Sequence, residues 1–552
     1  MKKLIILNLA LLSVFFVSIT GMAQQRLFTE FSQQRNTIDG KSAQILENVG
    51  RKAVGEQVQV LNFNTDALQA SQLLINIQGK EFEFVLDELD IRNSDDFSWH
   101  GHEKGGVGYM VLVYSKGEMA GNLFVSGRTY SISPFGTGAV TFYEINPASY
   151  PPDHPEGAKQ KVYDMTGNAG SVKQNAETVI RVLVAYTSSA ESGVAGLGYS
   201  DITLFLQEAI SETNQSFINS NVAHRLKLAV NIEVGYNESS SSERDLDRFI
   251  STSDGYMDEI HSYRNYYSAD VGVLIINNDD YCGVASGIGS NANSAFCVVH
   301  YECVLGYYSF AHEIAHLHGC RHNSEVDPNT SPFAYGHGYI SPGNWRTIMA
   351  YNNYCNCPRI QYWSNPDISY GGRAMGNSST SDNARVLDAT APTVSNYRTA
   401  VTNLNLAGGA SLADNESGEA IATSSITLSS GFNVAYGAVF KATTGVPAAG
   451  AAIAENTLMY VQDNVVNADA IGEEFLQVFP NPTTGMVDVK FMNSDDEFQM
   501  ELFDANGTEI YRMDYSNLES VRINLSNKPS GIYYIQIKDS KGAVHSKRII
   551  LE

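Results

Sequence analysis

Five residues between positions 312 and 322 have the types and the spacing that metal chemistry needs. His312 and His316 are four residues apart, so a helix would place both imidazoles on one face, one turn apart, where they can converge on a single ion. Glu313 directly follows the first histidine and can reach a water held by that ion. Gly319 lets the chain leave the helix sharply, since glycine adopts positive φ without a steric cost. His322 comes three residues later, and we expect its imidazole to complete the site.

Three neutral imidazoles with an open fourth position are typical of a catalytic zinc site, whereas structural zinc sites are closed by four protein ligands. The chain has 12 histidines in 552 residues. On composition alone, the five-residue pattern would arise with a probability on the order of 10⁻⁵. The pattern therefore predicts one catalytic Zn²⁺ ion, with His312, His316 and His322 as metal ligands and Glu313 as the catalytic base. Calcium binding is left open.

Three neighbouring histidines are expected to have structural roles instead. His318 lies in the same predicted helix but points away from the face shared by the two ligands. His300 and His337 are interpreted as packing or solvent-facing residues, which is the commoner role of an isolated histidine.

The segment Thr347–Tyr351, after the histidines, strengthens the interpretation. Its methionine, Met349, follows the histidine pattern at the distance at which the metzincin metallopeptidases carry their Met-turn, so the chain resembles that clan over roughly residues 177–400. The resemblance implies that Met349 lies beneath the metal ligands as a hydrophobic base. Tyr351 stands where some metzincins place a tyrosine that stabilises the developing oxyanion, so it is a candidate catalytic residue; an ordinary packed tyrosine is the alternative.

Within the clan, the chain is similar to bacterial reprolysin-like enzymes and peptidyl-Asp metalloendopeptidases. The resemblance rests on Tyr308–Ala311 before the histidines and Tyr362–Pro366 after the Met-turn. It implies a secreted zinc-dependent endopeptidase that hydrolyses peptide bonds of extracellular proteins. An Asp preference would also follow from it, with Arg346 or Arg359 as the source of positive charge. In one departure, Asn323 stands where reprolysins usually carry Asp.

Two other functions are alternatives to a peptidase. A non-catalytic binding module that keeps the metal only for structure would have no use for Glu313 beside an open coordination position. A zinc hydrolase acting on other substrates would have little need of a prosegment. The peptide substrate is expected to pair, as an extended strand, with a sheet edge between Cys282 and His300.

The first residues predict export. Lys2 and Lys3 precede an apolar stretch that ends near Ile19, and small residues follow, as in a signal peptide over residues 1–23. The apolar stretch is shorter than the ~20 residues of a membrane-spanning helix, so no membrane span is expected. The formal net charge of −24 argues against a nucleic-acid partner. The protein is therefore expected to be secreted, passing through the periplasm.

All six cysteines lie in one part of the chain. In an exported protein, an even number of cysteines predicts disulfides, and six cysteines allow 15 pairings. Cys282–Cys303 is the first choice, because that bond would fix the loop leading into the active-site helix. The cysteines are Cys282, Cys297, Cys303, Cys320, Cys355 and Cys357.

Hydrophobic periodicity divides the remainder of the chain. Residues 24–175 show short strands, such as 123–132, and end in a proline-rich stretch with the composition of a linker. Their place before the catalytic segment resembles that of a metzincin propeptide, which implies that they form one. Residues 176–400 alternate strands with helices, such as 244–263, and are expected to form the catalytic domain. Residues 401–470 are interpreted as a linker with a small β module.

Residues 471–552 show about seven short strands and predict a β-sandwich. Phe479–Gly485 and Gly531–Tyr534 resemble the C-terminal sorting domain of the Bacteroidetes type IX secretion system, which implies that its machinery is a partner. The expected fold class is therefore α/β (α+β): a metzincin-like catalytic domain with a twisted mixed sheet and an active-site helix, between a β-rich prodomain and a C-terminal β-sandwich.

A propeptide raises the question of latency. No cysteine precedes Cys282, so a propeptide cysteine cannot block the metal. Asp153 is the slightly preferred blocking residue, and His154, His100 and His102 are the alternatives.

Overall fold

The computed structural model describes most of the first 446 residues and separate pieces of the rest. The described residues are 25–31, 39–93, 96–153, 161–165, 178–446, 457–461, 476–479, 486–491, 497–504, 509–516, 520–525, 528, 531–539 and 544–551. The predicted signal peptide, residues 1–23, and His154 lie outside them. No helix among these residues is both long and apolar enough to cross a membrane.

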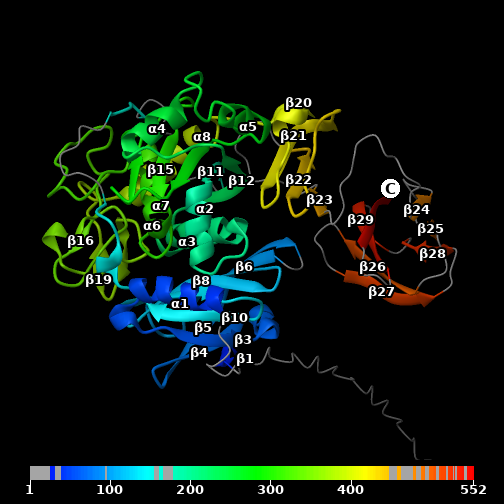
Figure 1. Ribbon diagram of the computed structural model, residues 1–552, viewed down its shortest axis with the longest axis horizontal. Coiled ribbons are helices and arrows are strands. Elements are labelled where there is room, and N and C mark those ends of the chain that lie inside the picture. The colour runs from blue at the N-terminus through cyan, green and yellow to red at the C-terminus, as the bar shows by residue number, and fades with distance from the viewer. Residues whose placement is uncertain are drawn as a thin grey trace, which may run out of the picture.

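A mixed sheet forms the centre of the catalytic region (Figure 1), in the order β14-β15-β13-β11-β12-β21-β22-β23. Strands β11 (Val179–Thr187), β12 (Arg225–Val234), β13 (Val271–Ile276) and β15 (Phe296–His300) are parallel. These strands are mostly apolar and buried, as expected for a parallel sheet covered on both faces, although β12 also carries charged residues that are partly or fully exposed. The edge strand β14 (Gly283–Ala285) runs antiparallel to β15. A mixed sheet with helices was predicted, and the structure confirms it.

Helix α3 (Ile202–Asn219) confirms the long helix indicated by the sequence. The predicted helix over residues 244–263 is wrong, because two shorter helices, α4 (Ser242–Ile250) and α5 (Ile260–Tyr266), occupy that stretch. Between them, Gly255 has φ +85 and its amide, like that of Asp254, donates to the carboxylate of Asp258. These local polar contacts compete with helical hydrogen bonds and interrupt the helix.

The N-terminal region folds into a ten-stranded sheet. Helix α1 (Gly40–Lys52), which the sequence analysis missed, lies between the second and third strands along the chain. The single strand predicted at 123–132 is wrong, because Ser126 and Gly127 adopt positive φ and turn the chain between β8 (Glu118–Val125) and β9 (Arg128–Pro134). The remaining strands are β1 (Gln25–Arg26), β2 (Phe28–Glu30), β3 (Gln59–Phe63), β4 (Gln72–Ile77), β5 (Lys80–Asn93), β6 (Asp96–Glu103), β7 (Tyr109–Ser115) and β10 (Ala139–Glu144).

Helix α3 lies between the two sheets and joins them. One hydrophobic cluster includes Val111 and Ala120 of the N-terminal sheet together with Phe205 of α3 and Val182 of β11. Buried polar pairs cross the same boundary, and Asn122 donates to the carboxylate of Glu212 at 2.5 Å. The N-terminal region therefore packs against the catalytic region through a shared core.

Residues 401–446 extend the catalytic sheet. Strands β20 (Val401–Leu406), β21 (Ser417–Leu428) and β22 (Val439–Thr444) pair in parallel, and β22 pairs antiparallel with β23 (Thr457–Val461). Strand β21 pairs antiparallel with β12 at Val230–Gly418. The predicted β module thus contains strands, and they continue the sheet that carries the site.

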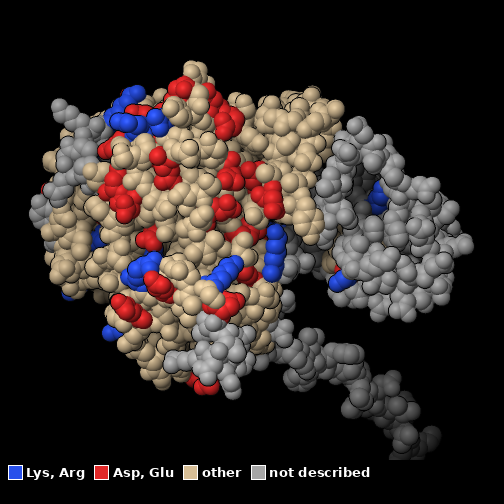
Figure 2. All heavy atoms as spheres, in the orientation of Figure 1, with Lys and Arg blue, Asp and Glu red and all other residues tan. Residues whose placement is uncertain are grey.

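Seven C-terminal strands form two antiparallel sheets that share one hydrophobic cluster. One sheet contains β24 (Leu476–Phe479), β25 (Met486–Phe491) and β28 (Ser520–Asn524); the other contains β26 (Glu497–Asp504), β27 (Glu509–Ser516), β29 (Gly531–Asp539) and β30 (Val544–Leu551). On the face drawn in Figure 2, acidic side chains are spread over the catalytic region, in keeping with the net charge of −24.

Candidate metal centre and active site

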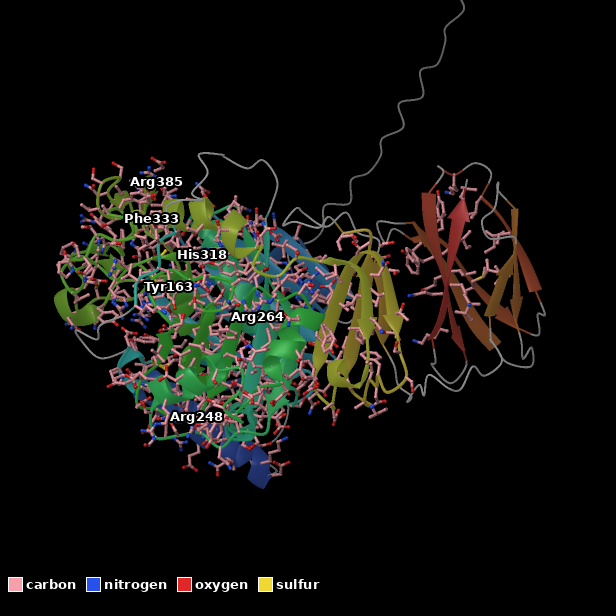
Figure 3. All side chains as sticks on the ribbon, turned by 90° about the horizontal axis from the view of Figure 1, so that it is seen from above. Tyr163, Arg248, Arg264, His318, Phe333 and Arg385 are labelled. Atoms are coloured by element: carbon pink, nitrogen blue, oxygen red, sulfur yellow. A yellow bond between two sulfur atoms is a disulfide. The ribbon has the colours of Figure 1, made fainter. Side chains whose placement is uncertain are left out.

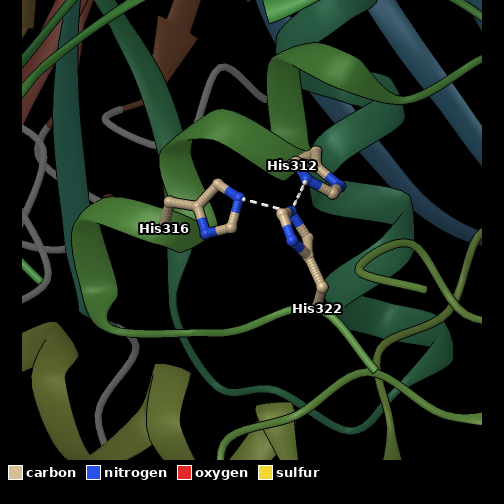
Figure 4. A group of neighbouring side chains, drawn as sticks. All are labelled: His312, His316 and His322. Carbon is tan, nitrogen blue, oxygen red and sulfur yellow. Dashed lines mark hydrogen bonds between the residues drawn. The ribbon is translucent and has the colours of Figure 1, made fainter. Parts of the chain in front are cut away.

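Helix α7 (Ser309–His318) carries the first two predicted ligands. It ends at Gly319, which adopts φ +102, and the amides of Gly319 and Cys320 donate to carbonyl oxygens of the last turn. This left-handed glycine turns the chain back toward the helix, as the spacing predicted. His322 therefore faces His312 and His316 (Figure 4).

The three histidines converge through their Nε2 atoms. Nε2 of His322 lies 3.1 Å from Nε2 of His312 and 3.0 Å from Nε2 of His316. Tetrahedral ligands at metal–nitrogen distances of about 2.0–2.1 Å would lie roughly 3.3 Å apart, close to these separations. All three residues are buried. The donor set therefore fits a divalent metal ion.

Two backbone carbonyls orient the ligands on the α7 helix. Nδ1 of His312 lies 3.1 Å from the carbonyl oxygen of Ile348, and Nδ1 of His316 lies 2.9 Å from that of Cys320. A carbonyl accepts only, so each Nδ1 carries the proton and each Nε2 presents its lone pair to the metal position. His337 supports the third ligand, because its Nδ1 donates to the carbonyl oxygen of His322 at 2.8 Å.

Glu313 is almost fully buried and faces the edge strand. An added Cβ at Gly283 of β14 would lie 2.7 Å from Cγ of Glu313, so only glycine leaves room for this side chain. Oε2 of Glu313 has no hydrogen-bond partner among the described residues. Burial, and then the charge of Asp153, raise the pKa of Glu313 well above its usual value. A carboxylate with a free oxygen beside the three histidines is suited to accept a proton.

The segment from Thr347 to Tyr351 contains a turn and contacts two of the three histidines. Met349 is fully buried in the same hydrophobic cluster as Ile314 of α7. The ring of Tyr351 lies 4.2 Å from the ring of His322, centroid to centroid. The amide of Tyr351 donates to Oδ1 of Asn323 at 2.9 Å. The residue that departs from the reprolysin pattern thus fixes the backbone of the candidate tyrosine, a role that the sequence analysis missed.

Four other histidines contact residues outside the group of three candidate ligands. His318 bonds Thr390 at 2.7 Å and stacks on His224, with 5.3 Å between ring centroids. His300 is buried, and its Nε2 lies 3.9 Å from the carboxylate of Glu302. Two latency candidates belong to the N-terminal sheet, where His100 contacts Gln215 of α3 at 3.0 Å and His102 contacts Asp87 at 2.6 Å.

The cysteines pair only in part. Cys282 and Cys303 form a disulfide, with their Cα atoms 5.4 Å apart, which confirms the first choice. Cys355 pairs with Cys357, two residues along. Cys297 and Cys320 are free and buried, so the expectation that all six cysteines form disulfides is wrong. Both thiols lie in the hydrophobic cluster around α7, where free cysteine packs as a small apolar residue.

One contact of the site joins residues far apart in the sequence. Nη2 of Arg359, in the wall after the Met-turn, lies 2.8 Å from the carboxylate of Asp153, at the end of the N-terminal region. The metal-ligand group of the described residues consists of the three histidines. The structure therefore pairs Asp153 with an arginine of the site.

Comparisons with known proteins agree with this geometry. Residues 176–364 match the model of metallo-peptidase family M12, and residues 477–552 match a secretion system C-terminal sorting domain. A peptidyl-Asp metalloendopeptidase of Stenotrophomonas maltophilia is 45% identical over 365 residues, which cover 62% of this chain and 86% of the relative. One of Xanthomonas campestris pv. campestris is 39% identical over 360 residues, covering 62% of this chain and 85% of the relative.

The matched sorting domain marks the chain as a secreted protein that uses the type IX secretion system. Protein substrates follow from the peptidase family. The chain is therefore a secreted metalloendopeptidase that belongs, with the peptidyl-Asp metalloendopeptidases, to the reprolysin-like M12 family.

Proposed function

We propose that this metalloendopeptidase uses one zinc ion, held by His312, His316 and His322, to hydrolyse peptide bonds next to aspartate. The observation that carries the proposal is the convergence of three buried imidazole Nε2 atoms beside the carboxylate of Glu313. Three imidazoles with an open position suit zinc. The preference for aspartate is supported by the name shared by the relatives and by a buried arginine, Arg359, in the site.

A zinc ion supplies two effects at such a site, since it acidifies a water molecule and polarises the scissile carbonyl. Glu313 accepts the proton of the attacking water through its unpartnered oxygen and delivers the proton to the leaving amine nitrogen. The hydroxyl of Tyr351 donates a hydrogen bond to the carbonyl oxygen as that oxygen gains charge. The backbone carbonyls of Ile348 and Cys320 keep two ligands in one tautomer throughout.

The substrate backbone is proposed to pair with β14, the edge strand of the sheet. Glu313 packs against Gly283 of this strand, so a peptide on β14 would bring its carbonyl close to the base. Residues 24–175 are proposed to act as a propeptide, 176–400 as the peptidase domain, 401–470 as a connection with β strands and 471–552 as a β-sandwich that directs export.

Two rival functions remain distinguishable by experiment. A binding module would hold zinc but digest nothing, and a hydrolase of another class would leave proteins intact. The test is digestion of casein by the secreted protein with and without a zinc chelator, with zinc content measured by mass spectrometry. We expect chelation to abolish digestion and zinc to restore it, and cleavage sites mapped on a peptide library to lie beside aspartate. Digestion that survives complete removal of zinc would contradict the proposal.

A further inference from the structure

Residues 150–152 of the N-terminal region lie against the loop that precedes α7 and against the start of the edge strand. The ring of Tyr150 stacks on that of Tyr307, with centroids 4.5 Å apart, and its hydroxyl donates to the carbonyl oxygen of Leu305 at 3.4 Å. The amide of Cys282, one residue before β14, donates to the carbonyl oxygen of Pro152 at 2.8 Å. Residues 150–152 are therefore fixed between the loop and the start of the edge strand.

The chain approaches the same edge again ten residues later. The amide of Tyr163 donates to the carbonyl oxygen of Ile288 at 2.9 Å, and the amide of Ile288 donates to that of Lys161 at 2.7 Å. Met165 follows and is buried, with its sulfur 3.4 Å from the amide of Ser290. Figure 3 labels Tyr163 among the side chains of the catalytic region. The N-terminal region thus forms backbone hydrogen bonds with both ends of the segment 282–290, which contains β14.

Asp153 stands between these two contacts and reaches into the site. Its side chain is 12% exposed and that of Arg359 is 3% exposed, so the ion pair is nearly withdrawn from water. The N-terminal region therefore places a largely buried carboxylate against an arginine in the wall of the site.

Arg359 is positioned by contacts with Tyr307, and its Nε–H remains available as a hydrogen-bond donor. Its Nη1 donates to the carbonyl oxygen of Tyr307 at 2.9 Å, and its guanidinium lies 4.4 Å from the centre of the Tyr307 ring. Its Nε has no hydrogen-bond partner among the described residues, although it lies on the same edge of the guanidinium as the Nη2 that binds Asp153. This edge can bind a carboxylate through two parallel hydrogen bonds.

The other arginine considered from the sequence is turned elsewhere. Nη1 of Arg346 donates to the carbonyl oxygen of Ala350 at 2.6 Å, and its Nε donates to that of Cys357 at 3.4 Å. Burial, and then the neighbouring charge of Arg359, lower the pKa of Arg346 to about 10. Arg346 thus stabilises the wall behind the site, and Arg359 is the arginine whose guanidinium binds a carboxylate there.

We propose that Arg359 selects the acidic side chain of the substrate, and that Asp153 occupies this subsite in the precursor as an internal mimic of that side chain. The inference rests on the proposed function and assigns its specificity and its latency to one ion pair. A buried guanidinium is costly without an anion. In the precursor Asp153 supplies the anion, and once residues 150–165 leave, the aspartate of a substrate replaces it.

The first experiment tests selection with the secreted protein and three peptides that differ only in Asp, Asn or Ala at the cleavage site. The variant Arg359→Gln should lower kcat/KM for the Asp peptide by roughly 30-fold or more and change the Asn peptide by less than about threefold. Arg359→Lys keeps the charge but loses the two-bond geometry, so it should recover part of the preference. Arg373→Gln, an exposed arginine on β19 (Arg373–Met375), is the control and should keep the ratio. An equal fall for Asp and Asn peptides would overturn the selection role.

The second experiment tests the mimic and does not depend on folding of an Arg359 variant. The intact precursor of Asp153→Asn, verified by mass spectrometry, should hydrolyse the Asp peptide at a higher initial rate than the intact wild-type precursor. Asp87→Asn, which alters a carboxylate of the N-terminal sheet, should leave that rate unchanged. An Asp153→Asn precursor that is as latent as wild type overturns the mimic, and one that binds zinc more weakly assigns Asp153 to the metal and overturns it equally.

Different results contradict the proposed function and the role of Arg359. A wild-type protein that hydrolyses none of the peptides, with or without zinc, contradicts the proposed function. A wild-type protein that prefers the Asp peptide, with the same preference in Arg359→Gln, contradicts only the inference about Arg359.

Discussion

Glu313 lies beside the three histidines, but its expected role differs from theirs. The histidines present lone pairs at 3.0–3.1 Å from one another, which is the geometry of ligands. Glu313 instead packs on Gly283 and keeps one oxygen without a partner among the described residues. Binding and proton transfer should therefore be separable by substitution.

Glu313→Gln should remove activity and keep the metal. The amide has the same size and can still form hydrogen bonds, but it cannot accept the proton of the water. The loss of general base catalysis should lower kcat by about 10²–10⁴-fold. Zinc stoichiometry and peptide hydrolysis check the prediction, and His316→Ala is the contrast, because two remaining ligands should hold zinc poorly. Loss of zinc in Glu313→Gln would show that this residue is a ligand.

Tyr351→Phe tests whether the hydroxyl acts on the transition state. The ring would keep its contact with His322, and the backbone amide would keep the hydrogen bond that it donates to Asn323. If the hydroxyl stabilises the oxyanion, kcat should fall by roughly 10²-fold while KM and the melting temperature change little. Tyr362→Phe, in the same wall, is the control. An unchanged kcat would assign Tyr351 to packing alone.

At the scale of elements, an ion cluster joins the added strands to the catalytic sheet. Glu419 of β21 is buried, and its carboxylate lies 3.3 Å from Arg181 of β11, 2.9 Å from Lys227 of β12 and 3.5 Å from Lys441 of β22. Burial opposes ionisation of Glu419, but Lys227, Arg181 and Lys441 lower its pKa below the usual value. The cluster therefore links four strands, including the central strand of the sheet.

Glu419→Gln should destabilise the catalytic region. Removing one partner of a buried ion pair costs about 3–5 kcal/mol, and the lower end applies because the Lys227 side chain is 38% exposed and can be solvated. The melting temperature should fall accordingly, whereas Glu233→Gln, an exposed residue of β12, should leave it unchanged.

The same variant predicts a pH dependence. A carboxyl whose pKa is lower in the folded state contributes stability above its unfolded pKa of about 4.3, and that stability is lost as the pH falls toward the folded pKa. The difference in melting temperature between wild type and Glu419→Gln should therefore be constant above pH ~5 and shrink below pH ~4. A difference that grows in acid would contradict the role assigned to the carboxylate.

For the whole molecule, the C-terminal strands form a unit with its own core. Their two sheets share one hydrophobic cluster, which contains residues only from position 478 onward. Met349 and the apolar residues of helix α7, which surround the site, belong to another cluster, with members between Ile45 and Val394. Catalysis and export are therefore expected to depend on different parts of the chain.

Truncation after Ala470 should separate export from catalysis. The shortened protein should remain active in vitro after recovery from cells, because the site and its supporting sheet are complete. It should accumulate in the periplasm, because residues 471–552 are proposed to direct passage across the outer membrane. Full-length Glu313→Gln is the control and should be exported although it is inactive. Normal export of the truncated protein would refute the sorting role.

The amino-acid sequence by itself was enough to predict the candidate metal ligands, the candidate base and the candidate Met-turn. His312, Glu313 and His316 lie within one turn of one helix, so 3.6-residue periodicity places them without knowledge of the fold. Gly319 reverses the chain locally and brings His322 back over six residues. The family and the sorting domain were also predicted from short local motifs, and the comparisons confirm both.

The tertiary structure decided the contacts between residues that are distant along the chain. Asp153 and Arg359 are 206 residues apart, and only the packing of the N-terminal sheet on α3 brings them together. The pairing of Cys282 with Cys303, and the burial of Cys297 and Cys320 as free thiols, depend on where strands and helix meet. The helix predicted at 244–263 failed for the opposite reason, because local polar contacts around Gly255 override the apolar periodicity. Spacing specifies contacts within one element, whereas contacts between elements follow from burial of the apolar faces that join them.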